Sequence, residues 1–98
     1  MAEKTKIQLD FNIPVKLFKE GQSYVAYTPV LDLSSCGKTE KKALQNISEA
    51  AQLFIKECIK DGTLEEVLQS LGWKKEKSSN AWKPPKVVDL EVPIAVSV

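Results

Sequence analysis

The segment that decides the fold spans residues 24–55 and reads YVAYTPVLDLSSCGKTEKKALQNISEAAQLFI. Its first four residues are β-prone, and a second alternating run starts at Leu31, after Pro29 has interrupted the first. Gly37 permits a sharp turn, after which apolar residues recur at spacings of three and four, as on one face of a helix. That face consists of Leu44, Ile47, Ala51, Phe54 and Cys58. The segment therefore predicts a small sheet packed under one long helix.

Local signals predict the ends of this helix and a second one after it. The long helix should run from about Glu40 to Lys60, with Thr39 as its N-cap and Gly62 ending it in a left-handed conformation. A shorter helix should follow at once, because Thr63 and Glu66 match a capping box. Its apolar face is formed by Leu64, Val67, Leu68 and Leu71, before Gly72.

The strands of the sheet are predicted from period-two alternation. Apolar residues occupy every second position from Ile7 to Leu17, which indicates a half-buried strand. Residues 19–22 provide a turn into a second strand over 23–28, and so short a connection makes the pair antiparallel. A third strand over about 31–36 completes an antiparallel meander.

The C-terminal part has two predicted sections. Residues 73–86 are rich in lysine, serine, asparagine and proline, which indicates a loop whose ends are held by Trp73 and Trp82. Residues 87–98 alternate again and predict a final strand. Ile94, Ala95 and Val96 are apolar on both phases, so both faces of this strand should be covered. Two arrangements would cover them: pairing with a second copy of the chain, or insertion beside the first strand of the same sheet.

Several of these residues also match the pattern of a known family. They are Tyr24-Val25-Ala26-Tyr27-x-Pro29, then Leu31-Asp32-Leu33-Ser34-x-Cys36-Gly37-x-Thr39, then Ala43, Leu44, Ile47 and Glu49-Ala50. This signature resembles the N-terminal domain of HicB-family antitoxins of prokaryotic toxin–antitoxin pairs, and weaker similarity continues through residues 63–68 and 82–85. The resemblance implies a degraded ribonuclease H-like fold. It also implies a partner, since members of the family bind and silence a small ribonuclease toxin called HicA, and many carry a second, DNA-binding domain.

The composition argues against several chemical functions. The chain has fourteen basic residues against thirteen acidic ones, and all fourteen are lysines. Without arginine it lacks the planar fork that reads guanine edges, so direct DNA binding is doubtful. It has no histidine, which removes the commonest general base and the commonest metal ligand. We therefore expect no enzyme activity, no catalytic residues and no cofactor.

Carboxylates and cysteines offer only weak alternatives. True ribonucleases of the related fold hold metal ions with strand carboxylates, for which Asp10, Asp32 and Asp89 are the candidates here. Only Asp89 has a second carboxylate nearby, at Glu91, so no metal site is expected; Asp32 can instead bond to turn amides. The two cysteines lie twenty-two positions apart, without metal-ligand spacing, and both are expected to be buried thiols.

Two groups of residues are candidates for contact with a partner. Lys38, Lys41 and Lys42 crowd the first turn of the long helix, where they are either a solvated face or a contact for an anion or a toxin. A nucleotide-binding P-loop is excluded, because the required glycine is replaced by Asp32. Tyr24 and Tyr27 fall on opposite phases of their strand, so at most one is fully in the core.

Together these patterns predict one α+β domain over residues 1–98, without a separate DNA-binding domain. It should contain a three-stranded antiparallel meander covered by a long helix, a short second helix and a C-terminal strand. The expected function is that of a HicB-like antitoxin or a stand-alone relative, which sterically blocks a small HicA-type ribonuclease. The alternative is a free-standing dimeric module that binds another protein or an anion. A chain of 98 residues has a modest core, so we expect at least a homodimer. No signal peptide or membrane span is evident, which favours the cytoplasm.

Overall fold

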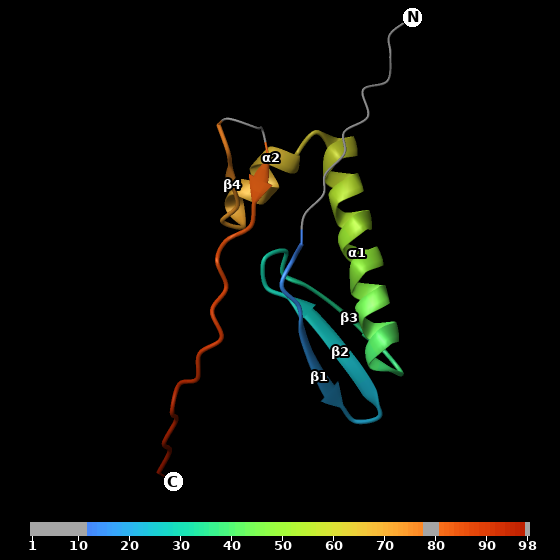
Figure 1. Cartoon of the computed structure of the whole chain (residues 1–98), viewed down its shortest axis with the longest axis vertical. Coiled ribbons are helices and arrows are strands. Elements are labelled where there is room, and N and C mark those ends of the chain that lie inside the picture. Colours follow the sequence, from blue (N-terminus) through green and yellow to red (C-terminus); the bar gives the residue numbers. More distant parts are fainter. Residues whose placement is uncertain (1–11, 78–80, 98) are drawn as a thin grey trace, which may run out of the picture.

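The structure is a computed structural model that describes residues 12–77 and 81–97 (Figure 1). It has the predicted α+β architecture, with an antiparallel sheet in the order β1-β2-β3, a long helix across one face, a short helix and a small C-terminal strand pair. The elements are β1 (Lys16–Glu20), β2 (Ser23–Thr28), β3 (Leu33–Gly37), α1 (Glu40–Asp61), α2 (Leu64–Ser70), β4 (Lys74–Lys75) and β5 (Trp82–Lys83).

The three-stranded sheet follows the predicted meander, but its first strand is displaced along the sequence. Leu17 pairs with Ala26, and Phe18 pairs with Val25. The strand expected over residues 7–17 begins only at Lys16; residues 12–15 form no ladder, and residues 7–11 lie outside the described part of the chain. Alternation marks which face of an extended segment is apolar, whereas the ladder itself is set by where the turn at residues 21–22 brings the two segments together.

Helix α1 begins and ends as its sequence predicts. The backbone N–H of Lys42 donates to the hydroxyl oxygen of Thr39 over 3.0 Å, and Gly62 ends the helix with φ at 71°. Gly37 is required just before the helix, because a Cβ atom at this position would lie 2.6 Å from the backbone nitrogen of Ala43. Glycine therefore lets β3 approach the first turn of α1 closely.

The buried face of α1 differs in part from the predicted one. Ile47, Ala51 and Cys58 are buried as expected, but Leu44 is 43% exposed and Phe54 is only partly buried. The full set of buried residues is Ala43, Ile47, Ala51, Ile55 and Cys58. Both sets have helical spacing, so periodicity alone could not separate them. At the start of the helix, where β3 approaches the helix backbone closely, Ala43 packs with Ala26 and Ile47 in one buried cluster.

A cluster of buried side chains connects α1 and the loop after β2 with α2 and the two tryptophans. It contains Val30, Leu31, Ala51, Ile55, Leu68, Trp73 and Trp82. The indole N–H of Trp73 donates to the backbone carbonyl of Val30 over 2.8 Å. Both tryptophans thus hold the ends of the segment expected to be a loop, and β4 and β5 form a two-stranded ladder inside it.

The start of α2 corrects one prediction. Thr63 precedes the helix, but its side chain makes no capping hydrogen bond to it. Its hydroxyl group instead donates to the carbonyl of Cys58 at 3.5 Å, so it bonds back to the end of α1. The expected capping box with Glu66 is therefore wrong. The two helices are so close in sequence that the Thr63 side chain bonds to the end of α1 and does not cap α2.

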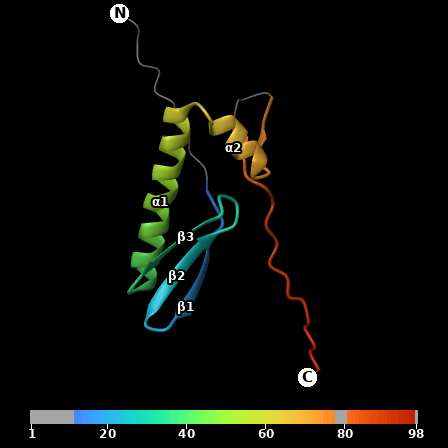
Figure 2. The same ribbon diagram turned by 180° about the vertical axis from the view of Figure 1, so that it is seen from behind.

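The segment expected to be the final strand is extended but unpaired. Residues 84–97 carry no ladder within the described chain and run away from the body beside the sheet, on the side opposite α1 (Figures 1 and 2). The arrangement in which this strand inserts into its own sheet is therefore wrong for this structure. Alternation can specify an extended, amphipathic segment, but a strand also needs an edge to pair with.

Candidate protein-interaction surfaces

The first candidate surface is the basic end of the molecule, where α1 starts. Tyr24 pairs with Gly37 across the sheet, which places its ring at the same end as the first turn of α1. The ammonium group of Lys19 lies 6.0 Å from the centre of this ring, and Tyr24 is half-buried against the sheet–helix core. Lys38, Lys41 and Lys42 are all exposed at this end. The structure thus gathers the three predicted lysines, Tyr24 and one unpredicted lysine.

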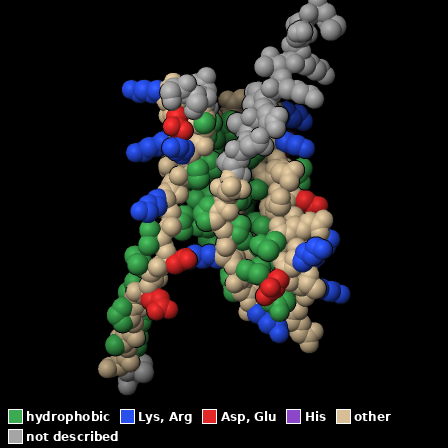
Figure 3. All heavy atoms as spheres, viewed as in Figure 1, with side chains coloured by type: hydrophobic (Ala, Val, Ile, Leu, Met, Phe, Trp, Pro, Cys, Tyr) green, Lys and Arg blue, Asp and Glu red, His purple; other side chains and the backbone are tan. Residues whose placement is uncertain are grey.

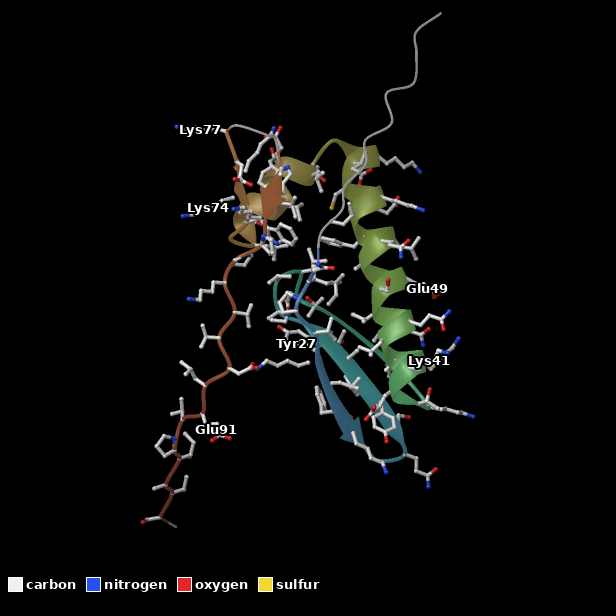
Figure 4. All side chains as sticks on the ribbon, in the orientation of Figure 1. Tyr27, Lys41, Glu49, Lys74, Lys77 and Glu91 are labelled. Carbon is white, nitrogen blue, oxygen red and sulfur yellow. The ribbon has the colours of Figure 1, made fainter. Side chains whose placement is uncertain are left out.

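Tyr27 belongs to a different surface. It pairs with Lys16 and Ser34 near the other end of β2, and its side chain lies on the phase opposite to Tyr24. Its hydroxyl group donates to a carboxylate oxygen of Asp32 over 3.0 Å. Figure 4 shows Tyr27 on the sheet and Lys41 on α1, well apart. Tyr27 therefore does not join the basic end.

The hydrogen bond to Asp32 changes the acidity of Tyr27. It raises the pKa of the phenol above its usual value of 10.0, with smaller contributions in the same direction from partial burial and from the negative charge of Asp32. Asp32 has a positive φ of 52° in the loop between β2 and β3. The carboxylate expected to bond turn amides therefore bonds the Tyr27 hydroxyl group instead.

A row of side chains crosses the outer face of the sheet, away from α1. Phe18, Val25 and Cys36 are directly opposite one another on the three strands, and Phe18 is 48% exposed. Cys36 is exposed, which corrects the expectation that both thiols are buried; Cys58 is buried. The exposure of Phe18 was not predicted from the sequence. The available signal was its phase, because it follows Leu17 and so falls on the polar side of the alternation.

Another exposed apolar surface is the C-terminal arm, defined here as residues 87–97. Its large apolar side chains are exposed, and Leu90 and Ile94 reach 81% and 79% exposure. Figure 3 shows these side chains as a line of hydrophobic groups projecting from the body. Ile94, Ala95 and Val96 are all exposed in this arm. Contiguous exposed apolar groups of this extent are typical of protein-interaction and membrane-interaction surfaces.

Two of the three acidic residues considered as metal ligands have other partners in the structure. Asp32 accepts from Tyr27, and Asp89 forms an ion pair with the ammonium group of Lys16 at 3.1 Å. Asp10 lies outside the described residues. Within residues 12–77 and 81–97, no three His, Cys, Asp or Glu side chains are grouped so that they could hold a metal ion.

No family model, curated protein or solved structure matches this chain. No helix among the described residues is long and apolar enough to cross a membrane.

Proposed function

We propose that this protein acts by binding another protein, as a HicB-like antitoxin or a stand-alone relative that neutralises a small HicA-type ribonuclease. The observation that carries the binding role is the exposed apolar surface, made of the C-terminal arm and the row across the outer sheet face. The class of partner is supported by the sequence signature at residues 24–50 alone.

The proposed mechanism is steric and uses no chemical step of the antitoxin. A sheet held rigidly on α1 covers the toxin active site and keeps RNA out. The basic end, with Lys38, Lys41, Lys42 and Tyr24, is one candidate contact because its charges would pair with acidic groups of a partner. Tyr27, on the other face, is a separate candidate contact.

We further propose that the protein works as a homo-oligomer, at least a dimer, through its terminal segment with Ile94, Ala95 and Val96. The exposure of these residues supports this proposal, since a lone chain would leave them in water. The same observation supports the second candidate function, a free-standing dimeric module that binds another protein without a toxin. Anion binding by the three lysines belongs to that alternative.

The test is an RNA-cleavage assay with a purified HicA-type ribonuclease encoded next to the gene of this protein. We expect the full chain alone to leave labelled RNA intact, and to inhibit the ribonuclease in proportion to the molar ratio until cleavage stops. A triple charge reversal, Lys38→Glu, Lys41→Glu and Lys42→Glu, should weaken inhibition if the basic end is the contact.

A matched control separates this surface from a general charge effect. The control changes the net charge by the same amount on exposed residues of the C-terminal strand pair and its connection, with Lys74→Glu, Lys77→Glu and Lys83→Glu. It should leave inhibition unchanged. Full ribonuclease activity in the presence of excess wild-type chain would refute the antitoxin role and leave the dimeric module.

A further inference from the structure

We propose that the C-terminal arm of one chain adds as a fourth strand to the free edge of β1 in a second chain, and that the two chains exchange arms reciprocally. This inference rests on the proposed homo-oligomer and adds to it the donor segment, the receiving edge and the symmetry. Each chain would then extend the three-stranded sheet of its partner.

The arm has the pattern of a strand that lacks a partner. Val88, Leu90, Val92, Ile94 and Val96 alternate with Asp89, Glu91, Pro93, Ala95 and Ser97. In an extended chain this alternation places the first set on one face and most polar groups on the other. The arm leaves the body after the buried Trp82, through Pro84 and Pro85, which favour an extended backbone. It is thus already in the conformation that strand addition requires.

The receiving edge is the free side of β1. The described sheet ends with β1 on one side and with β3 on the other, so two edges are available in principle. At β3, the side-chain amide of Asn46 on α1 donates to the carbonyl of Cys36 over 2.8 Å, so the helix already uses part of that strand. On β1, the half-exposed ring of Phe18 offers an apolar contact that a strand alongside would cover.

Charge and position also favour β1. The arm carries Asp89 and Glu91, whereas β1 carries Lys16 and Lys19 and one acidic residue, Glu20, at its end. The ion pair between Lys16 and Asp89, at 3.1 Å, holds the base of the arm near β1, on the sheet face that also carries Phe18. Both side chains are exposed, so this ion pair adds little binding free energy by itself. It mainly shows that the base of the arm lies near β1. The arm forms no ladder with its own sheet, and Figures 1 and 2 show it running away from the body.

Reciprocal exchange gives a closed assembly. If each arm pairs with the β1 edge of the other chain, the same contact is made twice about a two-fold axis, and no third chain is recruited. Pro93 is compatible with this arrangement, because the added arm is itself the new edge of the sheet and proline is tolerated there. Main-chain pairing of this kind is a common way for an extended segment to bind a sheet.

The experiment uses one variant that lacks the donor arm and one with a substitution in the receiving strand β1. Deletion of residues 90–98 removes the donor, and Phe18→Asp places a charge on the receiving strand. Light scattering should find the wild type as a dimer at micromolar concentration. Each variant alone should be a monomer there, which corresponds to a dissociation constant raised by about 30-fold or more, the effect of losing a hot-spot contact.

Mixing the two variants is the decisive measurement. The deleted chain still has an intact β1 edge, and the Phe18→Asp chain still has an arm, so the mixture should contain a heterodimer with one of the two exchanged contacts. Leu53→Asp is the matched control for the substitution, because Leu53 is exposed on α1, away from the arm, and this variant should remain dimeric. Far-UV circular dichroism should show that all variants keep their helices.

Any other result would contradict the reciprocal exchange of arms. A dimer that survives deletion of residues 90–98 would preserve the proposed homo-oligomer but show that the arm does not form it. Two monomeric variants that fail to combine would place the arm on its own chain or show that Phe18 is not at the receiving edge. A wild type that is monomeric until a ribonuclease is added would assign the arm to that partner and refute both the exchange and the homo-oligomer.

Discussion

The indole N–H of Trp73 donates to the carbonyl of Val30 over 2.8 Å, between residues separated by 43 positions in the sequence. This bond fixes the segment that follows α2 against the loop that follows β2. Both partners are almost fully buried, with exposures of 2% and 1%. Loss of the donor would therefore leave a buried carbonyl group without its partner.

We accordingly expect Trp73→Phe to lower the free energy of unfolding by about 1–3 kcal/mol, the usual cost of an unpaired buried polar group. Trp82→Phe is the control: Trp82 is also buried, but the Lys75 ammonium group contacts its ring face, 5.9 Å from the ring centre. Urea unfolding of both variants measures the difference. Equal losses for the two variants would mean that ring volume, and not the bond to Val30, matters.

The two threonines that precede helices should differ in their effect on stability. Thr39 caps α1 through the N–H of Lys42, so Thr39→Ala should cost about 0.5–2 kcal/mol. Thr63 makes no such cap, and its long bond to Cys58 is weak, so Thr63→Ala should cost less. Thermal unfolding followed by circular dichroism tests this order. A larger loss for Thr63 would show that the junction between the helices depends on that side chain.

The corrected buried face of α1 can be tested with two apolar residues three positions apart. Ile47 is 2% exposed, so Ile47→Ala should lower the free energy of unfolding by about 2–5 kcal/mol. Leu44 is 43% exposed, and Leu44→Ala should change it by no more than about 0.5 kcal/mol. Phe54 is only partly buried, so its truncation should cost less than that of Ile47. If Leu44→Ala is as damaging as Ile47→Ala, the helix is rotated towards the face that periodicity alone suggests.

The bond between Tyr27 and Asp32 predicts a titration at high pH. Because the pKa of Tyr27 is raised above 10.0 in the folded chain, the folded state favours the protonated phenol. Its contribution to stability is therefore complete below the pKa of the unfolded phenol and is lost as the pH rises through the higher, folded value.

Phenolate absorbance measured against pH tests this prediction, with Tyr27→Phe identifying the transition that belongs to Tyr27. Asp32→Asn removes the negative charge and should lower the pKa of Tyr27 towards its ordinary value. Ser34→Ala, next to Tyr27 in the sheet and outside this bond, should leave the transition in place. An unchanged titration in Asp32→Asn would show that the aspartate does not determine the acidity of Tyr27 in solution.

Much of the fold could be predicted from local signals. Thr39 and Gly62 mark the ends of α1 because capping depends on one side-chain oxygen and on one backbone conformation available to glycine. Strand β2 was predicted at its observed bounds, because a tight turn fixes the register of an antiparallel pair. For the candidate surfaces, the lysines at the helix start and the separation of Tyr24 from Tyr27 could be predicted from position and phase alone.

Other features depended on the tertiary structure. Two overlapping sets of residues on α1 have helical spacing, and only the packing of the helix shows that Ala43 and Ile55 belong to the buried set and Leu44 does not. The exposure of Cys36 and Phe18 and the bond from Tyr27 to Asp32 require the three strands to be in register. The sequence by itself determined that residues 87–98 form an amphipathic, extended segment. Only the tertiary structure decided that residues 87–97 form no ladder with their own sheet, because pairing depends on which edge lies within reach.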